Sequence, residues 1–415
     1  MKYLFLALLV CAELAFAEAR QIDDYQWEGV ERIVAVGDLH GDYDNYLATL
    51  IAAGLVDSKG KWTGGAAHLV QTGDIPDRGP DTQKIIEHIG KLDKQAQRKG
   101  GRVHNLIGNH EAMNVYGDLR YVHEGEYRAF VGRRSEALRD RYYQLYLENL
   151  KAQNPEKYES LPDDFRDQWN TEYPLGWVEH RQAWDPAWNP EGQYAQWVLN
   201  NKVAVRINDT VFLHGGNSGF YCQNSLASLT EMVLERLRNF DPANAGILED
   251  EFGPLWYRGL SGEAPEAPME TVDAILAQHG IKHIAVGHTP TSGVIWPRYD
   301  GKVVMIDTGI AGAYGGYVGY LEITSAGLFA GYPKGKLPLP SGDEGAIAYL
   351  EQVIELDPGN RHLQQRLERL NQPPAPEAAE TPETAAADEE SAAGGESPAE
   401  EAQAPPAMPV CGITQ

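Results

Sequence analysis

Five short apolar runs in this chain each lead into glycine-flanked residues that can bind metal ions. Runs of this length, rich in β-branched residues and bounded by glycine, predict buried strands of α/β units. Since parallel strands end at one edge of a sheet, the polar residues that follow should gather there. The sequence therefore predicts an α/β fold with a ligand site at that edge. The runs span residues 33–36, 68–71, 103–107, 211–213 and 284–286.

The polar residues after the runs form two sets of metal ligands. Asp38 and His40, two residues apart on a segment expected to be extended, should point the same way and bind one ion. Asp74 has two carboxylate oxygens and can bridge this ion to a second one. Mixed oxygen and nitrogen ligands suit Mn, Fe or Zn better than Ca, and imidazole in both sets argues against Mg alone. The second ion would take its remaining ligands from Asn109, His214 and His288.

The order and wording of these clusters resemble a known family. GDLHGD, GDIPDRG, GNHE, HGG and GHT are similar to the motifs of calcineurin-like metallophosphoesterases, in particular the phosphoprotein phosphatase branch. Within that branch, AMNVYGDLRYV after GNHE and the later GPLWYRG look most like Shewanella-like protein phosphatases. The resemblance covers roughly residues 30–330. Pro76 departs from it, because the family usually has a flexible apolar or aromatic residue there; it should stiffen the loop without removing a ligand.

The resemblance implies the same two ligand sets, with Asp74 shared by both ions. It also implies that a water or hydroxide bridging the ions attacks phosphorus in line. Two divalent ions about 3.5–4 Å apart lower the pKa of such a water and neutralise the attacking and leaving oxygens, so no covalent phosphoenzyme is needed.

His110 is the predicted general acid. It follows the ligand Asn109 and should face the other way on an extended segment. The resemblance implies that Asp77 hydrogen-bonds His110, orients the ring and keeps it protonated, which suits proton donation near neutral pH. Glu111 is either a residue that orients the ligands or an acid stabilised by a helix N-terminus.

Two arginines are expected to hold the substrate phosphate. Arg78 has a planar fork of donors that suits phosphate oxygens. Arg258 is the second choice, because it falls between His214 and His288, where the family places such a residue. Asn109 is expected beside the phosphate as well.

The predicted architecture is an α/β/β/α sandwich of two mixed sheets flanked by helices. Its catalytic domain should span residues 23–332 and contain a mostly helical cap insertion at residues 117–200, whose side chains would set which substrates fit. A glycine-rich hairpin through Tyr320 should end the domain. Residues 343–370 should then form a helical hairpin that breaks at residues 357–360.

The two ends of the chain predict export and disorder. Residues 1–17 have a positive start, an apolar stretch and an Ala15-Phe16-Ala17 cleavage site, so the mature protein should be periplasmic or secreted without a membrane anchor. Residues 371–415 are rich in Pro, Ala and Glu and should be disordered. Cys222 and Cys411 would remain after cleavage and can form a disulfide in an oxidising compartment.

These features predict a phosphomonoesterase with two metal ions that acts on phosphorylated proteins or peptides, at Ser/Thr phosphate, Tyr phosphate or both. A net charge of −25 argues against a nucleic-acid partner. The first alternative is a phosphatase of nucleotides, dinucleoside polyphosphates or other small molecules. The second is an inactive metal-bound binding module, against which the intact His110, Asp77 and Arg78 argue.

Overall fold

The computed structural model describes residues 19–342, 345–372 and 411. The predicted export signal and nearly all of the predicted disordered tail lie outside the described residues. Within the described residues, no helix combines the length and the apolar character that crossing a membrane requires.

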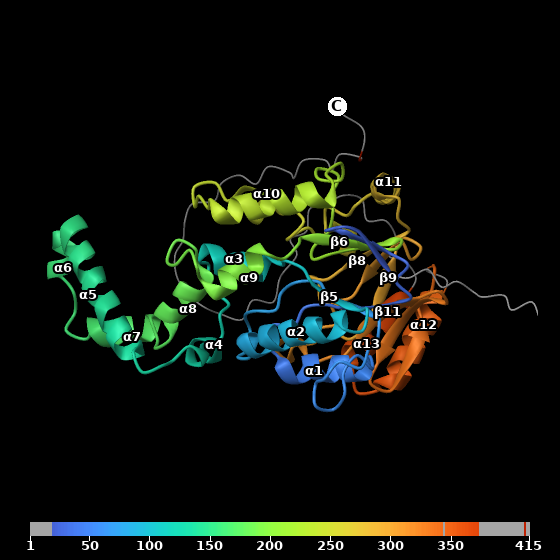
Figure 1. The fold of residues 1–415 in the computed structure, drawn as a ribbon, viewed down its shortest axis with the longest axis horizontal. Helices are drawn as coiled ribbons and strands as arrows, with labels where there is room; N and C mark the ends of the chain where they lie inside the picture. The colour runs from blue at the N-terminus through green and yellow to red at the C-terminus, as the bar shows by residue number, and fades with distance from the viewer. Residues whose placement is uncertain (1–18, 343–344, 373–410, 412–415) are drawn as a thin grey trace, which may run out of the picture.

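Two mixed β-sheets form the centre of the protein (Figure 1). The first runs in the order β1 (Arg20–Asp23), β2 (Gln26–Glu28), β6 (Ala204–Ile207), β7 (Thr210–Leu213), β8 (His283–Val286), β10 (Val303–Met305) and β9 (Trp296–Arg298). The second runs in the order β13 (Gly335–Pro338), β12 (Gly327–Tyr332), β11 (Tyr320–Thr324), β3 (Arg32–Val36), β4 (His68–Gln71) and β5 (Arg102–Asn105). Strands β3, β4 and β5 are parallel, as are β7, β8 and β10, so each sheet has an edge where several carboxyl ends meet.

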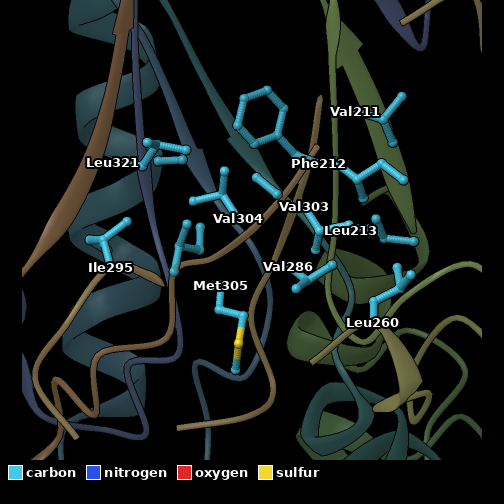
Figure 2. Close-up of a cluster of buried hydrophobic side chains, with 14 of the residues drawn as sticks. Val211, Phe212, Leu213, Leu260, Val286, Ile295, Val303, Val304, Met305 and Leu321 are labelled. Atoms are coloured by element: carbon cyan, nitrogen blue, oxygen red, sulfur yellow. The ribbon is translucent and has the colours of Figure 1, made fainter. Parts of the chain in front are cut away.

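The main core lies between the two sheets. Phe212, Val304 and Leu321, from β7, β10 and β11, belong to this core, and Figure 2 shows them between the strands. Strand β3 alternates: Ile33 faces this core, whereas Val34 packs in a second core with the helices outside the sheet. Burial on both faces explains the continuous apolar runs in the sequence.

Helices cover the outer faces of the sheets and complete the predicted four-layer α/β/β/α sandwich. Figure 1 shows one pair of helices on one side and a second pair on the other. These are α1 (Tyr43–Ala52) with α2 (Thr82–Gln97), and α10 (Leu226–Arg238) with α11 (Met269–His279).

The segment 117–200 is mostly helical. Its helices α5 to α7 extend away from the sheets in Figure 1, whereas α4, α8 and α9 lie closer to them. Aromatic rings hold the extended part together: the centroid of Tyr142 lies 5.6 Å from that of Trp169 and 5.2 Å from that of Trp177. The helices are α4 (Glu124–Ala129), α5 (Ser135–Gln153), α6 (Pro155–Glu159), α7 (Phe165–Glu172), α8 (Trp177–Trp184) and α9 (Gln193–Leu199).

Two helices follow the last strand and dock beside the loop after β8. They are α12 (Ala346–Leu356) and α13 (Arg361–Leu370), and the break between them falls where the sequence predicts it. Asn360 accepts a hydrogen bond from the backbone N of His362 at 3.1 Å and donates one to the Ser292 carbonyl at 2.8 Å. This residue therefore both begins α13 and fixes the hairpin to the loop.

Two further features refine the sequence predictions. The hairpin formed by β11 and β12 begins at Tyr320 rather than passing through it, because the glycine-rich residues before it form a loop with a short 3-10 turn, Gly312–Tyr314. Cys222 forms a disulfide with Cys411 across 189 residues of sequence.

Candidate active site

The predicted ligands converge at the carboxyl ends of the central strands. All six are buried, and they come from both sheets. Asp38 and His40 follow β3, Asp74 follows β4, Asn109 begins α3 (Asn109–Tyr116) after β5, His214 follows β7, and His288 follows β8. The structure therefore brings together every residue that the sequence predicts as a ligand.

One group of these atoms surrounds His214. Its Nδ1 lies 3.0 Å from the Thr72 carbonyl, which can only accept, so Nδ1 carries the proton and Nε2 keeps a free lone pair. That Nε2 lies 2.9 Å from Asn109 Oδ1, 3.0 Å from His288 Nδ1 and 3.3 Å from Asp74 Oδ2. These are buried acceptors that face one another, an arrangement that a cation would satisfy.

A second group surrounds His40. Its Nδ1 lies 3.1 Å from the Pro76 carbonyl and donates to it, so Nε2 is free to bind an ion. This Nε2 lies 3.9 Å from Asp38 Oδ2 and 3.8 Å from Asp74 Oδ2. Pro76 thus removes no ligand, and its carbonyl orients one. The same Asp74 oxygen faces both groups.

Asp38 and His40 were expected to meet because they lie on an extended segment, and this expectation of an extended segment is wrong. His40 has a φ of 41°, so the chain turns there instead of staying extended. The backbone N of Leu39 and that of His40 both donate to the Asp74 carbonyl, at 2.9 and 3.0 Å, and these bonds hold the turn. The two side chains reach the same place because of this turn.

Two carboxylates of the site, Asp38 and Asp307, are buried where their negative charge is unfavourable. Burial, followed by repulsion from Asp307 and Asp74, raises the pKa of Asp38 well above its usual value. Burial raises the pKa of Asp307 to about 6. Buried carboxylates that repel one another favour bound cations or protons, and the unprotonated imidazole nitrogens beside them favour a metal ion. The residues therefore fit divalent metal ions. Asp307 was not predicted, although it follows β10 at the same edge.

His110 forms a short hydrogen bond with Asp77, 2.5 Å between Nδ1 and Oδ2. Asn114 donates to the other Asp77 oxygen at 2.9 Å. Burial lowers the pKa of His110, but Asp74 and Asp77 raise it by more, so the net pKa is above its usual value. The predicted extended segment is wrong here, because Asn109 and His110 form the first turn of α3. The turn still separates the two side chains, since successive helical residues point in different directions.

Glu111 orients the loops of the site. Its carboxylate accepts hydrogen bonds of 2.8 Å from the backbone N of Asp74, Ile75 and Gly108. The structure bears out both alternatives that the sequence leaves open, because Gly108 is the N-cap of α3 and Glu111 lies in the first turn of that helix, while the bonds from Asp74 and Ile75 orient the ligand loop. Burial and the charge of Asp74 raise the pKa of Glu111 to about 7.

The start of the inserted segment holds the turn that carries Asp77 and Arg78. Both residues have left-handed backbone conformations, with φ of 74° and 63°, which non-glycine residues adopt rarely. The backbone N of Asp77 donates to Glu126 at 2.7 Å, and that of Arg78 donates to the Tyr121 carbonyl at 3.0 Å. Glu126 also accepts from Thr82 at 2.6 Å and is fully buried. Sequence reasoning missed Glu126, because nothing in its neighbourhood marks it as different from a surface glutamate.

The two predicted phosphate-binding arginines lie at the site in different ways. The guanidinium of Arg78 stacks 4.1 Å from the centre of the Tyr121 ring. Arg258 donates from Nη1 to the His288 carbonyl at 2.9 Å and to Thr289 Oγ1 at 3.1 Å. Arg258 therefore stands beside a predicted ligand and also fixes the loop that carries it.

Comparisons with known proteins identify the family. Residues 31–292 match the family described as calcineurin-like phosphoesterase. The chain belongs to this family. As a member of the calcineurin-like phosphoesterases, the protein is a hydrolytic phosphatase that depends on divalent metal ions.

Relatives narrow the branch of the calcineurin-like phosphoesterases. The chain is 31% identical over 305 residues to Shewanella-like protein phosphatase 2 of Arabidopsis thaliana, which covers 72% of this chain and 76% of the relative. It is 33% identical to an uncharacterised protein of Schizosaccharomyces pombe, over 70% of this chain and 77% of that one. The solved structure of a cold-active protein-tyrosine phosphatase from a psychrophilic Shewanella species has a TM-score of 0.57 and 27% identity, and the match covers 77% of this chain and 83% of that chain. The protein is therefore similar to Shewanella-like protein phosphatases along most of its length.

Proposed function

We propose that the protein removes phosphate from phosphorylated proteins or peptides, at Ser/Thr phosphate, Tyr phosphate or both, with two divalent metal ions. The observation that carries the proposal is the position of Asp74 Oδ2, which faces His214 on one side and His40 on the other, with the His110–Asp77 pair beside it. Two relatives, a Shewanella-like protein phosphatase and a protein-tyrosine phosphatase, support the choice of substrate class.

The two ligand groups would divide between the ions. One ion would be bound by Asp38, His40 and Asp74. The other ion would be bound by Asp74 together with Asn109, His214 and His288. When bound, the ions supply an activated water as nucleophile and neutralise charge on the phosphate. The combination of carboxylate, amide and imidazole ligands favours Mn, Fe or Zn.

His110 would act as general acid. Because Asp77 occupies Nδ1, the proton on Nε2 is the one free to move, and Nε2 lies 3.9 Å from Asp74 Oδ2 at the centre of the site. Asp77 would hold the ring in place and favour its protonated form, so the imidazolium can give its Nε2 proton to the leaving oxygen.

Arg78, Arg258 and Asn109 would orient the phosphate. Stacking on Tyr121 limits the motion of the Arg78 guanidinium and leaves the N–H donors at its edge free, which suits a phosphate group. Arg258 already uses Nη1 for the loop after β8, so its remaining donors would reach the substrate.

A substrate profile tests the proposal. The purified enzyme, loaded in turn with Mn, Fe or Zn, should show a higher kcat/KM for phosphopeptides than for nucleotides or dinucleoside polyphosphates. If a dinucleoside polyphosphate exceeds every phosphopeptide tested, the protein is a small-molecule phosphatase instead.

We further infer that the protein is exported to the periplasm or secreted after removal of residues 1–17, and that it has no nucleic-acid partner. The disulfide between Cys222 and Cys411 supports an oxidising compartment. Mass spectrometry of protein from cell fractions should give a mature chain that begins at Glu18 and lies outside the cytoplasm. An intact Met1 terminus in the cytoplasmic fraction would contradict the inference.

A further inference from the structure

A cavity of about 420 Å³, separate from the metal ligands, opens at the same end of the sheets as the active site. Met305, the last residue of β10, and the loop after β8 form its floor. The rest of its lining comes from Ser261 and from four residues of α13, namely His362, Arg366, Arg369 and Leu370. We call this cavity the basic pocket.

The basic pocket adjoins the site through Arg258. This residue donates to Thr289 Oγ1, which lines the pocket, and to the carbonyl of the predicted ligand His288. The carbonyl of Arg258 accepts a hydrogen bond of 2.9 Å from the backbone N of Ser261, which also lines the pocket. A peptide that places a phosphate at the metal ligands can therefore reach the pocket with a neighbouring side chain.

The charge of the pocket is opposite to that of the whole protein. The chain has a net charge of −25, yet among the residues that the structure describes no acidic side chain lines this cavity. Two arginines and one histidine line it, and hydroxyl groups of the neighbouring loop complete its polar surface. A cavity of this kind selects an anionic group.

Arg366 is held in place without an acidic partner among the described residues. Its guanidinium lies 4.0 Å from the centre of the Trp296 ring, and within the described part of the chain its side chain makes one hydrogen bond, a long one of 3.5 Å to the Thr291 carbonyl. Burial, followed by the positive charges of Arg369 and Arg298, lowers the pKa of Arg366 to about 10. Arg298 is itself paired with Glu266, whereas Arg369 lines the pocket beside Arg366. A partly buried guanidinium next to a second arginine gains from a bound anion.

A second polar atom points to a ligand. Ser261 Oγ is buried and has no hydrogen-bond partner among the described residues. A buried hydroxyl without a partner costs free energy that an added acceptor would recover. An anion in the pocket would offer such an acceptor.

We propose that the basic pocket binds an anionic side chain of the substrate, next to the phosphate that is removed. The enzyme then prefers phosphopeptides that carry a carboxylate or a second phosphoryl group close to the scissile phosphate. This inference rests on the proposed function, and it names the class of peptide that the enzyme selects.

The test compares three phosphopeptides that differ at one flanking position: alanine, glutamate, or a non-hydrolysable phosphonate analogue of phosphoserine. The phosphonate arm distinguishes a preference for phosphoryl groups from one for carboxylates. Each kcat/KM is divided by that for a small aryl phosphate, which is too small to reach both sites. We expect a preference of about tenfold for an anionic peptide, mainly through KM, as one charge-assisted hydrogen bond would give.

Three variants make the test specific. Arg369→Glu reverses a charge at an exposed position, and Arg366→Gln removes the stacked guanidinium. Arg361→Glu is the matched control, because Arg361 is exposed on the same helix and does not line the pocket. Arg369→Glu should abolish or invert the preference, whereas Arg361→Glu should keep it.

The results separate this inference from the proposed function. If phosphopeptides are hydrolysed without an anionic preference, or if Arg361→Glu removes the preference as strongly as Arg369→Glu, the basic pocket is not a substrate site and the inference is wrong. If the aryl phosphate is hydrolysed but no phosphopeptide is, the proposed function and the inference fail together.

Discussion

The sheet edge and the inserted segment 117–200 contribute to the site in different ways. The sheet edge supplies all the predicted metal ligands, each of them buried, and backbone hydrogen bonds fix several of them, such as the bond from His40 N to the Asp74 carbonyl. The inserted segment supplies no ligand, and most of its longest helix, α5, is exposed. Its first residues nevertheless hold the turn of Asp77 and Arg78 through Tyr121 and Glu126. Metal binding and acid catalysis should therefore respond separately to mutation.

The largest effect is expected at the sheet edge, from Asp74→Ala. Loss of the carboxylate that faces both ligand groups should remove metal. Turnover should then fall roughly 10³-fold or more, to background, because the bound ions supply several kcal/mol of transition-state stabilisation. Elemental analysis and a phosphatase assay on the same sample check this. A variant that keeps both metals would show that Asp74 does not bridge them.

His110→Asn should separate chemistry from metal binding. The variant should keep the metal content of the wild type, because the His110 ring is not in the predicted ligand set, and turnover should fall roughly 10²–10⁴-fold through loss of the general acid. Elemental analysis and steady-state kinetics decide the point. Metal-depleted His110→Asn protein would contradict the division of roles.

Glu126→Ala tests the contribution of the inserted segment. Without its acceptor the turn of Asp77 and Arg78 should shift, and small displacements of catalytic groups cost up to about 10²-fold in rate. We expect a fall of roughly 10-fold to 10²-fold in kcat with metals retained. Glu126→Gln keeps an oxygen acceptor for the Asp77 N–H and should restore most of the turnover. Equal losses in both variants would show that this hydrogen bond does not position the acid.

The same residue predicts a pH dependence of stability. Burial, with the charge of Asp77, raises the pKa of Glu126 from its usual 4.5 to about 8. Between these values the folded state binds a proton that the unfolded state has lost, so this group lowers stability as pH rises from about 5 to 8. Denaturant unfolding of wild type and Glu126→Gln at several pH values checks this: the variant should gain stability relative to wild type as pH rises. A constant difference across the range would show that Glu126 does not titrate in this way.

Cys411→Ser should have the smallest effect on turnover. The disulfide with Cys222 lies in the main core and not at the ligands, so hydrolysis of a small aryl phosphate should stay at the wild-type rate. The free energy of unfolding should fall by about 2–4 kcal/mol, because the unfolded chain is no longer constrained. Cys222→Ser removes the same disulfide from the other side and should give the same loss of stability. A clear loss of turnover with metals retained would connect the end of the chain to the site.

The metal ligands at the sheet edge could be predicted from the sequence, whereas the contacts through which the inserted segment supports the site could not. Apolar runs followed by Asp, His and Asn are a local signal, and the parallel strands bring those residues together. The reasons for their geometry were less predictable: His40 lies in a turn and Asn109 starts a helix, although both were expected on extended chain. Glu126 and Asp307 could not be assigned, because their roles depend on contacts between distant segments. The basic pocket likewise forms only when α13 docks beside the loop after β8.

Metal stoichiometry coupled to activity tests the central claim most directly. Chelator-treated enzyme is titrated with Mn, and bound metal and turnover of an aryl phosphate are measured on the same samples. We predict no turnover without metal and full turnover only when two ions are bound per chain, with the Asp74→Ala variant failing to recover. Full turnover with one ion per chain, or turnover that persists without metal, would contradict a site built around a shared Asp74.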